Sequence, residues 1–311
     1  MTFSIVALDP ATGDLGVAVA SKFLAVGSAV PWARAGVGAI ATQAYANLHY
    51  GPDGLALLAE GVSAAEVVER LTGADRARDY RQLGVVDAAG DSASYTGAAC
   101  TDWAGGRRVD GVAAQGNILV GPSVVDAMID TYRAARERRF PDRLIAALQA
   151  GDDAGGDSRG RQSAALLVVR TGAGYLGGGD RLVDLRVDDH PDPLPELTRL
   201  RSLHALMWDV ALPDELLPVD EELASELRWL LDRVGARPRS TADEDLDALL
   251  GVEGGSPSPV GVARPFPPGW NDDWQARLSG WMGTANLEMR AAANGWIDPV
   301  VLDQLRIAAP I

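Results

Sequence analysis

The pattern of apolar and polar positions at the start of the chain predicts a β-hairpin. Apolar residues dominate positions 3–8, turn-forming residues follow at positions 9–14, and a second apolar run occupies positions 15–20. The second run is too short for a helix, and a cluster of Asp, Pro and Gly between two apolar runs favours a turn. We therefore expect two antiparallel strands at the N-terminus.

Thr2 stands at the edge of this predicted hairpin. It follows the initiator Met1 and is small enough for Met1 to be trimmed, which would leave a free α-amine beside the threonine hydroxyl. An N-terminal amine can take the proton of its own hydroxyl and so activate a weak nucleophile. Thr2 is therefore a candidate nucleophile, against the plain alternative that it is merely the second residue of the chain.

Further along the chain, short apolar runs broken by glycine predict strands, and longer periodic runs predict helices. Strands are expected across residues 23–43 and at 80–86, 92–96, 111–115, 162–169 and 182–187. Helix pairs are expected at 55–61 with 63–71, and at 122–138 with 142–150. Helix pairs that separate runs of strands favour an α+β fold with antiparallel sheets. A four-layer αββα sandwich, in which two sheets lie between outer layers of helices, satisfies this order.

The last third of the chain has a different pattern. An apolar helix is expected at residues 194–210, an amphipathic helix at 221–234, a Gly- and Pro-rich linker at 251–268, and helices at 287–294 and 295–305. These changes predict a domain over residues 1–195, a helical connection over 196–219 and a small helical C-terminal module over 220–311.

Two groups of apolar residues in this part of the chain need a partner surface. Trp270, Trp274 and Trp281 are expected to form the core of the small module or a dimer contact. The apolar stripe of residues 194–210 must be buried against the chain itself or against a second copy. Because two-fold dimers are the commonest closed assemblies, we expect a homodimer.

Composition excludes several classes of partner. With 311 residues, 47% of them hydrophobic, the chain can bury a substantial core. Its formal net charge of −15 and pI near 4.6 argue against a nucleic-acid or anionic-membrane partner, because such partners require clustered cations. No run approaches the ~20 apolar residues of a membrane span, and no basic region precedes a long apolar core. We therefore expect a cytoplasmic protein.

Cysteine and histidine content argues against metal chemistry. Cys100 is the only cysteine, which rules out an intrachain disulfide and a multi-cysteine zinc site. The three histidines, His49, His190 and His204, are not spaced as a helical ligand pair. The sequence therefore indicates no metal and no cofactor, and the expected partner is a small-molecule substrate.

The richest polar segment is residues 155–163. It holds three glycines beside the side chains of Asp157, Arg159, Arg161, Gln162 and Ser163. Such a composition makes a poor core and a good ligand loop, in which guanidinium groups suit a carboxylate or a carbonyl oxygen. The alternative is a solvated loop. The ligand reading is favoured because the segment runs directly into an apolar strand.

Other polar residues stand at the ends of expected strands, namely Ser21, Lys22, Arg34, Thr42 and Gln43. A cation near the N-terminal amine would lower the pKa of that amine by like-charge repulsion and keep it basic at pH 7. A single Lys or Arg is more often solvated. Gln115 and Asn117 would either supply amide donors to an oxyanion or simply turn the chain.

Five segments together resemble a known family. The segments are residues 2–7, 16–22, 30–38, 114–117 and 155–163, and they closely resemble the bacterial and archaeal family called domain of unknown function 1028. That family is similar to the N-terminal-nucleophile (Ntn) hydrolases, so the resemblance implies the αββα fold. From about residue 220 on, the chain resembles a small C-terminal module labelled peptidoglycan-binding.

The resemblance also implies roles for particular residues. Compared with proteasome β-subunits, Thr2 matches the nucleophile, Arg34 falls near the position of a lysine, and Ser21 stands in place of an acidic residue. Asp157 and Ser163 resemble the supporting Asp and Ser. Arginine does not shuttle protons as lysine can. The two hypotheses are therefore an Ntn hydrolase that cleaves a C–N amide-type bond, and an inactive Ntn-fold protein that holds a small ligand through Arg34, Arg159 and Arg161.

Overall fold

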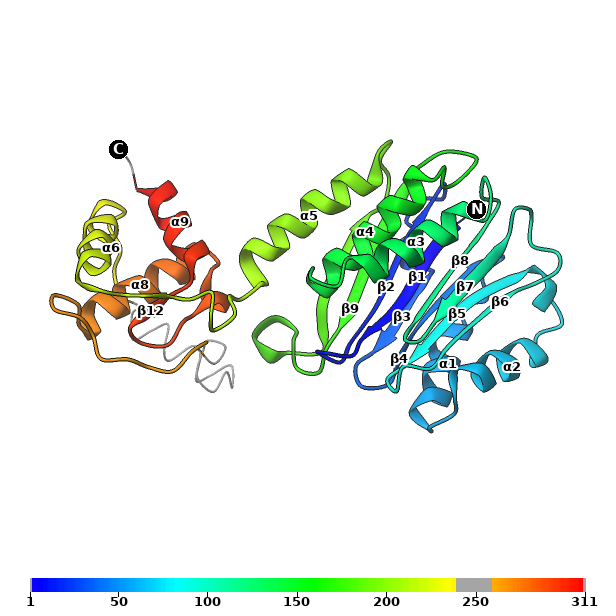
Figure 1. Ribbon diagram of the computed structural model, residues 1–311, viewed down its shortest axis with the longest axis horizontal. Coiled ribbons are helices and arrows are strands. Elements are labelled where there is room, and N and C mark those ends of the chain that lie inside the picture. The colour runs from blue at the N-terminus through cyan, green and yellow to red at the C-terminus, as the bar shows by residue number, and fades with distance from the viewer. Residues whose placement is uncertain (1, 239–258, 310–311) are drawn as a thin grey trace. The chain divides into compact units, whose positions relative to one another are not determined.

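The computed structural model describes residues 2–238 and 259–309 (Figure 1). The chain divides into two compact units, residues 1–201 and 202–311. The division falls within the segment 196–219 that was expected to connect two domains. Each unit is described by itself below.

The first unit contains two antiparallel sheets. In the six-stranded sheet the order is β10 (Arg181–Val187), β9 (Ser163–Val169), β2 (Asp14–Ser21), β1 (Thr2–Asp9), β8 (Val112–Asn117) and β7 (Gly105–Val109). In the four-stranded sheet the order is β3 (Pro31–Arg34), β4 (Gly38–Ala44), β5 (Arg81–Asp87) and β6 (Ser92–Thr96). The predicted N-terminal hairpin is confirmed, because β1 pairs with β2 in register from Thr2–Ser21 to Asp9–Asp14.

Helices cover one face of each sheet (Figure 1). Helices α1 (Tyr50–Ala59) and α2 (Ala64–Ala74) pack on the four-stranded sheet, where they share an apolar cluster with β4 and β5. Helices α3 (Ser123–Ala134) and α4 (Phe140–Asp153) pack on the six-stranded sheet, and Leu194 and Leu197 of α5 (Pro193–Trp208) join the same cluster. The α+β class and the antiparallel sheets are as predicted.

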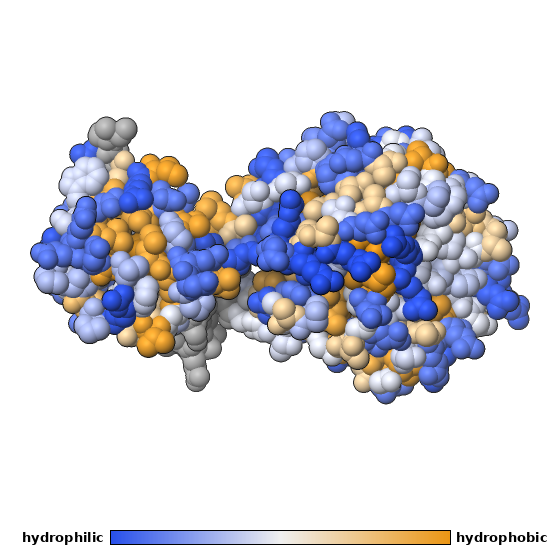
Figure 2. All heavy atoms as spheres, in the orientation of Figure 1, coloured by the Kyte–Doolittle hydropathy of each residue, from blue (hydrophilic) through white to orange (hydrophobic). Residues whose placement is uncertain are grey.

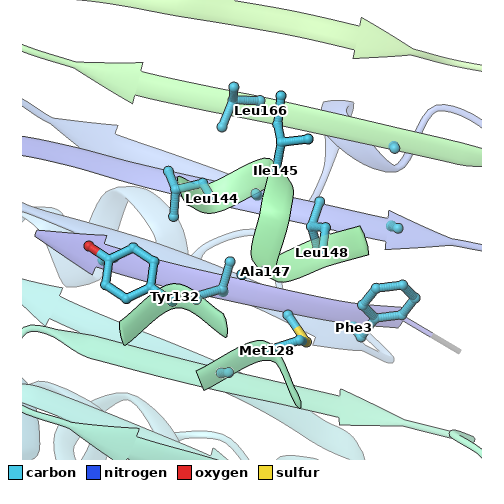
Figure 3. Close-up of a cluster of buried hydrophobic side chains, with 14 of the residues drawn as sticks. Phe3, Met128, Tyr132, Leu144, Ile145, Ala147, Leu148 and Leu166 are labelled. Atoms are coloured by element: carbon cyan, nitrogen blue, oxygen red, sulfur yellow. The ribbon is translucent and has the colours of Figure 1, made fainter. Parts of the chain in front are cut away.

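Both faces of the central strand β1 are buried. Phe3 lies under α3 and α4 with Met128 and Leu148, as Figure 3 shows. On the opposite face, Val6 and Leu8 join an apolar cluster between the two sheets. Because side chains alternate along a strand, Thr2 and Ser4 share the inter-sheet face with Val6 and Leu8. The layer between the sheets is thus polar at one end of β1 and apolar at the other.

Some predicted elements differ from the structure. Residues 23–30 form no strand, because Ala25 adopts a left-handed backbone (φ 53°) and a short 3-10 helix follows at Val26–Ser28. Strand β7 was not predicted. The helix predicted at 287–294 is only a 3-10 turn, Glu288–Arg290, and residues 251–258 of the predicted linker lie outside the described residues.

The second unit is built around its own apolar cluster. Helices α6 (Glu221–Arg233), α8 (Asp272–Thr284) and α9 (Pro299–Ala308) share this cluster, and β11 (Leu217–Pro218) pairs with β12 (Trp296–Ile297). Trp270 is buried in the cluster, and Trp274 and Trp281 pack against it. These tryptophans therefore have a packing role within the unit.

Polar and apolar residues are mixed on the visible face of the molecule. Figure 2 shows hydrophilic residues over much of the visible face, with apolar residues between them. Within the described part of the chain, no helix is long and apolar enough to cross a membrane.

Asp75, at the end of α2, ties the helical layer to the four-stranded sheet. Its carboxylate accepts hydrogen bonds from Asn47 Nδ2 (3.1 Å), Tyr50 Oη (3.0 Å) and Arg81 Nε (2.9 Å). Burial of the carboxylate raises its pKa, but hydrogen bonds from the Ala77 amide and from these three side chains outweigh burial and lower the pKa of Asp75 to about 2.

We predict that Asp75→Asn destabilises the protein in a pH-dependent way. The folded pKa lies below the unfolded value, so the charged carboxylate stabilises the fold above pH ~4, and this contribution is lost as the pH falls toward 2. The variant should lose on the order of 2 kcal/mol of unfolding free energy at pH 7. Urea denaturation at pH 7, 4 and 2.5 checks this, and a difference that does not shrink with acid would contradict it.

Candidate functional site

Four polar residues form a row across the end of the six-stranded sheet. In Cα register, Asn117 of β8 pairs with Thr2 of β1, Thr2 pairs with Ser21 of β2, and Ser21 pairs with Ser163 of β9. Thr2 is 7% exposed, and the other three residues are buried. The Oγ1 atom of Thr2 lies 3.0 Å from the Oγ atom of Ser21. The hairpin thus places the candidate nucleophile against a second hydroxyl.

A network of neutral side chains continues from this row between the two sheets. Ser4 donates a hydrogen bond to Gln43 Oε1 (2.6 Å) and accepts one from Gln115 Nε2 (2.7 Å). Gln43 Nε2 donates to the carbonyl oxygen of Thr2 (3.2 Å). The network therefore holds the backbone of the candidate nucleophile as well as the strands beside it.

Gln82 of β5 is the centre of this network. Its Oε1 atom accepts hydrogen bonds from Gln43 Nε2 (2.8 Å) and Asn117 Nδ2 (2.9 Å). Its Nε2 atom donates to Thr96 Oγ1 (2.9 Å) and to the carbonyl oxygen of Gly116 (2.7 Å). One side chain of the four-stranded sheet thus fixes the end of β8 beside Thr2.

The network leaves no room for a side chain at Gly84. A Cβ atom built there would lie 2.1 Å from Gln115 Oε1. This oxygen is buried, and no hydrogen-bond partner for it is found among the described residues. Since the Nε2 atom of Gln115 is held by Ser4, the amide cannot swing away easily. The absence of a side chain at Gly84 therefore allows the two sheets to approach each other closely at this end of β5.

Asp157 and Ser163 fix the segment that follows β2. Asp157 Oδ2 accepts from the backbone amide of Lys22 (2.8 Å), and Oδ1 accepts from the amide of Arg159 (2.9 Å). Ser163 Oγ donates to the carbonyl oxygen of Phe23 (2.5 Å) and accepts from the amide of Val26 (3.1 Å). Ser163, within the row, and Asp157, next to it, therefore fix the backbone of residues 22–26.

Arg34 does not lie near Thr2. The prediction that Arg34 acts on the N-terminal amine of Thr2 is therefore wrong. Arg34 pairs with Gly38 at the start of β4, whereas Gln43, which contacts Thr2, lies five residues further along that strand. At ~3.3 Å per residue the two ends of β4 are about 16 Å apart. The short β3–β4 hairpin carries Arg34 to the far end of the sheet.

Other predicted ligand residues are held by neighbours. Arg161 donates through Nε to Asp152 at 2.9 Å, a hydrogen bond that raises the pKa of Arg161. Gln162 donates to Asp189 (3.0 Å). The hydroxyl of Thr42 donates to the carbonyl oxygen of Asn47 (3.1 Å). Lys22 Nζ donates to the carbonyl oxygen of Arg161 (3.2 Å), and Arg159 contacts Asp157.

Sequence reasoning missed Ser4, Gln82 and Thr96. Ser4 is a single polar residue between apolar ones, whereas Gln82 and Thr96 stand near strand ends with other polar residues in the same strand, a pattern usually produced by a solvent-facing side of a sheet. A signal was present for Ser4, because the apolar residues Phe3 and Ile5 stand on both sides of it. A strand buried on both faces gives such polar residues a buried position that demands hydrogen-bond partners.

Metal and thiol chemistry find no support at the site. Within the part of the chain that the structure describes, no group of three or more His, Cys, Asp or Glu residues is placed to hold a metal ion. Burial raises the pKa of the Cys100 thiol, which keeps it protonated. The described side chains that surround Thr2 are hydroxyls and amides.

The comparisons agree on one family. Residues 2–197 match the model of the family of unknown function DUF1028. A crystal structure of a protein from Silicibacter pomeroyi, assigned to the same family, is 35% identical and superposes with a TM-score of 0.60, covering 66% of this chain and 86% of that one. No curated protein sequence matches the chain.

We predict that Gln82→Leu destabilises the first unit strongly. The substitution leaves the amide of Asn117 and the carbonyl oxygen of Gly116 without a buried partner, and each such loss costs about 1–3 kcal/mol. The control is Gln149→Leu on the exposed side of α4, which should change the unfolding free energy by less than ~0.5 kcal/mol. Equal stability of the two variants in urea would contradict a structural role for the network.

Proposed function

Since the chain belongs to the DUF1028 family of unknown function, we propose that it is an N-terminal-nucleophile hydrolase that cleaves a C–N amide-type bond of a small molecule. The observation that carries the proposal is the position of Thr2. It begins a central strand, lies between β2 and β8, and contacts Ser21 through its hydroxyl. A nucleophile at such a place is fixed on a rigid element rather than on a loop.

The fold is consistent with this proposal. Helices α3 and α4, the two sheets, and helices α1 and α2 succeed one another as layers, and apolar clusters lie at each of the three junctions. We propose that this arrangement is the αββα sandwich of the Ntn hydrolases. In that assignment Thr2 lies between the sheets, at the polar end of the inter-sheet layer.

The proposed reaction has two steps. After removal of Met1, which lies outside the described residues, the amine of Thr2 takes the proton of Oγ1 while Oγ1 attacks the amide carbonyl carbon. The C–N bond breaks, the leaving amine takes that proton, and an ester on Thr2 remains. Water, deprotonated by the same amine, then attacks the ester carbon and releases the carboxylic acid and free Thr2.

Neighbouring groups would orient rather than ionise the nucleophile. The Ser21 hydroxyl, 3.0 Å from Thr2 Oγ1, restricts the rotamer of Thr2. Gln43 holds the Thr2 carbonyl oxygen, and Asn117 is fixed beside it by Gln82. These are positioning contacts, and they suit a mechanism in which the base is supplied by Thr2 itself.

The non-hydrolytic hypothesis relied on three arginines acting together. Arg159 contacts Asp157, and Arg161 contacts Asp152, while Arg34 lies at the far end of β3. No observed contact places these three guanidinium groups around a common ligand position. The proposal therefore favours hydrolysis, in which Ser21, Gln43 and Asn117, expected from the sequence to bind substrate, position Thr2 and its strand instead.

We propose a binding role for the second unit. The resemblance of residues 220–311 to a peptidoglycan-binding module implies recognition of a glycan or peptide. Trp229 is exposed on α6 with Arg233 over its ring at 5.2 Å, whereas Trp270 is buried. An exposed Trp, rather than the buried one, would meet such a ligand.

We predict that Thr2 is the mature N-terminus and the acylated residue. Intact-mass analysis of the full-length protein should show loss of Met1, and a β-lactone probe should add one acyl group to the N-terminal peptide. Thr2→Ser should retain labelling because it keeps the hydroxyl, and Thr2→Ala should lose it. The control Thr171→Ala, in an exposed turn, should label normally. Quantitative retention of Met1 would rule out the mechanism.

We also predict a homodimer that uses the exposed part of α5. Leu194 and Leu197 are covered by the first unit, but Leu203 is 45% exposed, so only the later part of the apolar stripe is available. Light scattering should give twice the monomer mass for the full chain. Leu203→Glu should shift the protein toward monomer, because a buried unpaired charge is unfavourable. A monomeric wild-type chain would rule out the predicted homodimer.

A further inference from the structure

A pocket lies at the end of β1 opposite to Thr2. It has a volume of about 690 Å³ and is bordered by Leu8 and Asp9 at the end of the strand. Leu8 is six residues from Thr2, which corresponds to about 20 Å along an extended strand. The pocket is therefore separate from the candidate active site, and nothing in the proposed hydrolysis uses it.

One wall of this pocket is apolar. Leu8, Val109, Val112 and Tyr132 line it, and all but Val109 are buried against neighbouring layers. A wall of aliphatic and aromatic side chains of this kind binds the hydrocarbon part of a ligand, while a few placed polar groups fix its orientation.

The rest of the lining carries three arginines. Arg133 lies in the last turn of α3, Arg136 lies beyond that helix, and Arg143 comes from α4. Among the described residues, no carboxylate forms an ion pair with Arg133 or Arg136. A cation in the last turn of a helix is favourable by itself, which accounts for Arg133. It does not account for Arg136, which stands outside the helix.

Arg143 is the buried member of this group. The residue is 9% exposed, and its guanidinium lies 4.3 Å from the centre of the Tyr132 ring. Its ion pair with Asp9 is long, with 3.6 Å between Nη1 and Oδ1, and its Nε atom has no hydrogen-bond partner in the described structure. A buried cation that is incompletely paired gains from any oxyanion that reaches it.

The local charge is opposite to that of the chain. The three guanidinium groups face the two carboxylates that also border the pocket, Asp9 and Asp110, which leaves one positive charge. The chain as a whole has a net charge of −15. Concentration of positive charge on one pocket of an acidic protein attracts anions to that pocket in particular.

We propose that this pocket binds a small amphipathic anion. A carboxylate or phosphate group of the ligand lies between the guanidinium groups of Arg133, Arg136 and Arg143. The apolar part of the ligand packs on Leu8, Val112 and the ring of Tyr132. The site is a binding site and carries no chemical step.

Calorimetric titration of the full-length protein at low ionic strength tests the proposal. The probes are benzoate, phenyl phosphate and the neutral benzyl alcohol. At least one of the two anions should bind in the millimolar range or tighter, and benzyl alcohol should bind at least tenfold more weakly. Binding of benzoate alone assigns a carboxylate ligand, and binding of phenyl phosphate alone assigns a phosphate ligand. Binding of both shows that the pocket accepts either kind of oxyanion.

Matched variants locate the binding. Arg136→Ala should weaken anion binding about tenfold, the usual effect of losing one hydrogen bond to a charged group. Arg138→Ala removes another exposed arginine two residues away that does not line the pocket, and it should change binding less than about twofold. Thr2→Ala should bind as wild type, which separates this site from the proposed hydrolase. Circular dichroism confirms that each variant is folded.

Three outcomes would overturn the proposal. The first is that neither anion binds. The second is that benzyl alcohol binds as well as the anions, because the guanidinium groups would then contribute nothing. The third is that Arg138→Ala weakens binding as much as Arg136→Ala, because the effect would then reflect overall charge and not this pocket.

Discussion

Between the two sheets of the first unit, side-chain amides bond to one another where apolar side chains would ordinarily pack. Gln82 accepts from Gln43 and Asn117 and donates to the backbone of β8, so a single residue joins three strands from two sheets. Buried amides are tolerated only when their hydrogen bonds are nearly all made. The position of Thr2 depends on this condition, because its own carbonyl oxygen is one of the acceptors that the network satisfies.

The inter-sheet layer therefore has two chemically different ends. The polar end is rigid because its hydrogen bonds are directional, and it suits the precise placement of a nucleophile. The apolar end, with Val6, Val17 and Val86, supplies nondirectional burial that stabilises the packing of the two sheets. Beyond that end lies the arginine-lined pocket. One strand, β1, thus connects two places where a small molecule would meet the protein, and its interior residues serve the fold.

How much of this the sequence predicts depends on the range of the interaction. The N-terminal hairpin follows from local alternation and the turn at residues 9–14, and the α+β class follows from the order of elements. Gln43 and Gln115 were candidates because they are polar at strand ends. Arg34 was misplaced, because nothing local in the sequence tells which end of β3 faces the N-terminus. Ser4 and Gln82 were missed because their partners on other strands lie far along the chain: 39 or more residues from Ser4, and 34 and 35 residues from Gln82 for Gly116 and Asn117.

The burial of Thr2 has a consequence for the order of events during synthesis. Strand β1 is closed on one side by β2 and on the other by β8, which ends more than a hundred residues later in the chain. A peptidase must draw an extended terminus into its cleft, which a residue 7% exposed and paired on both sides does not permit. The removal of Met1 that the proposed mechanism requires would therefore have to compete with closure of the sheet. The nascent chain has free access to a processing enzyme only until residue 117 has emerged and β8 has found its place.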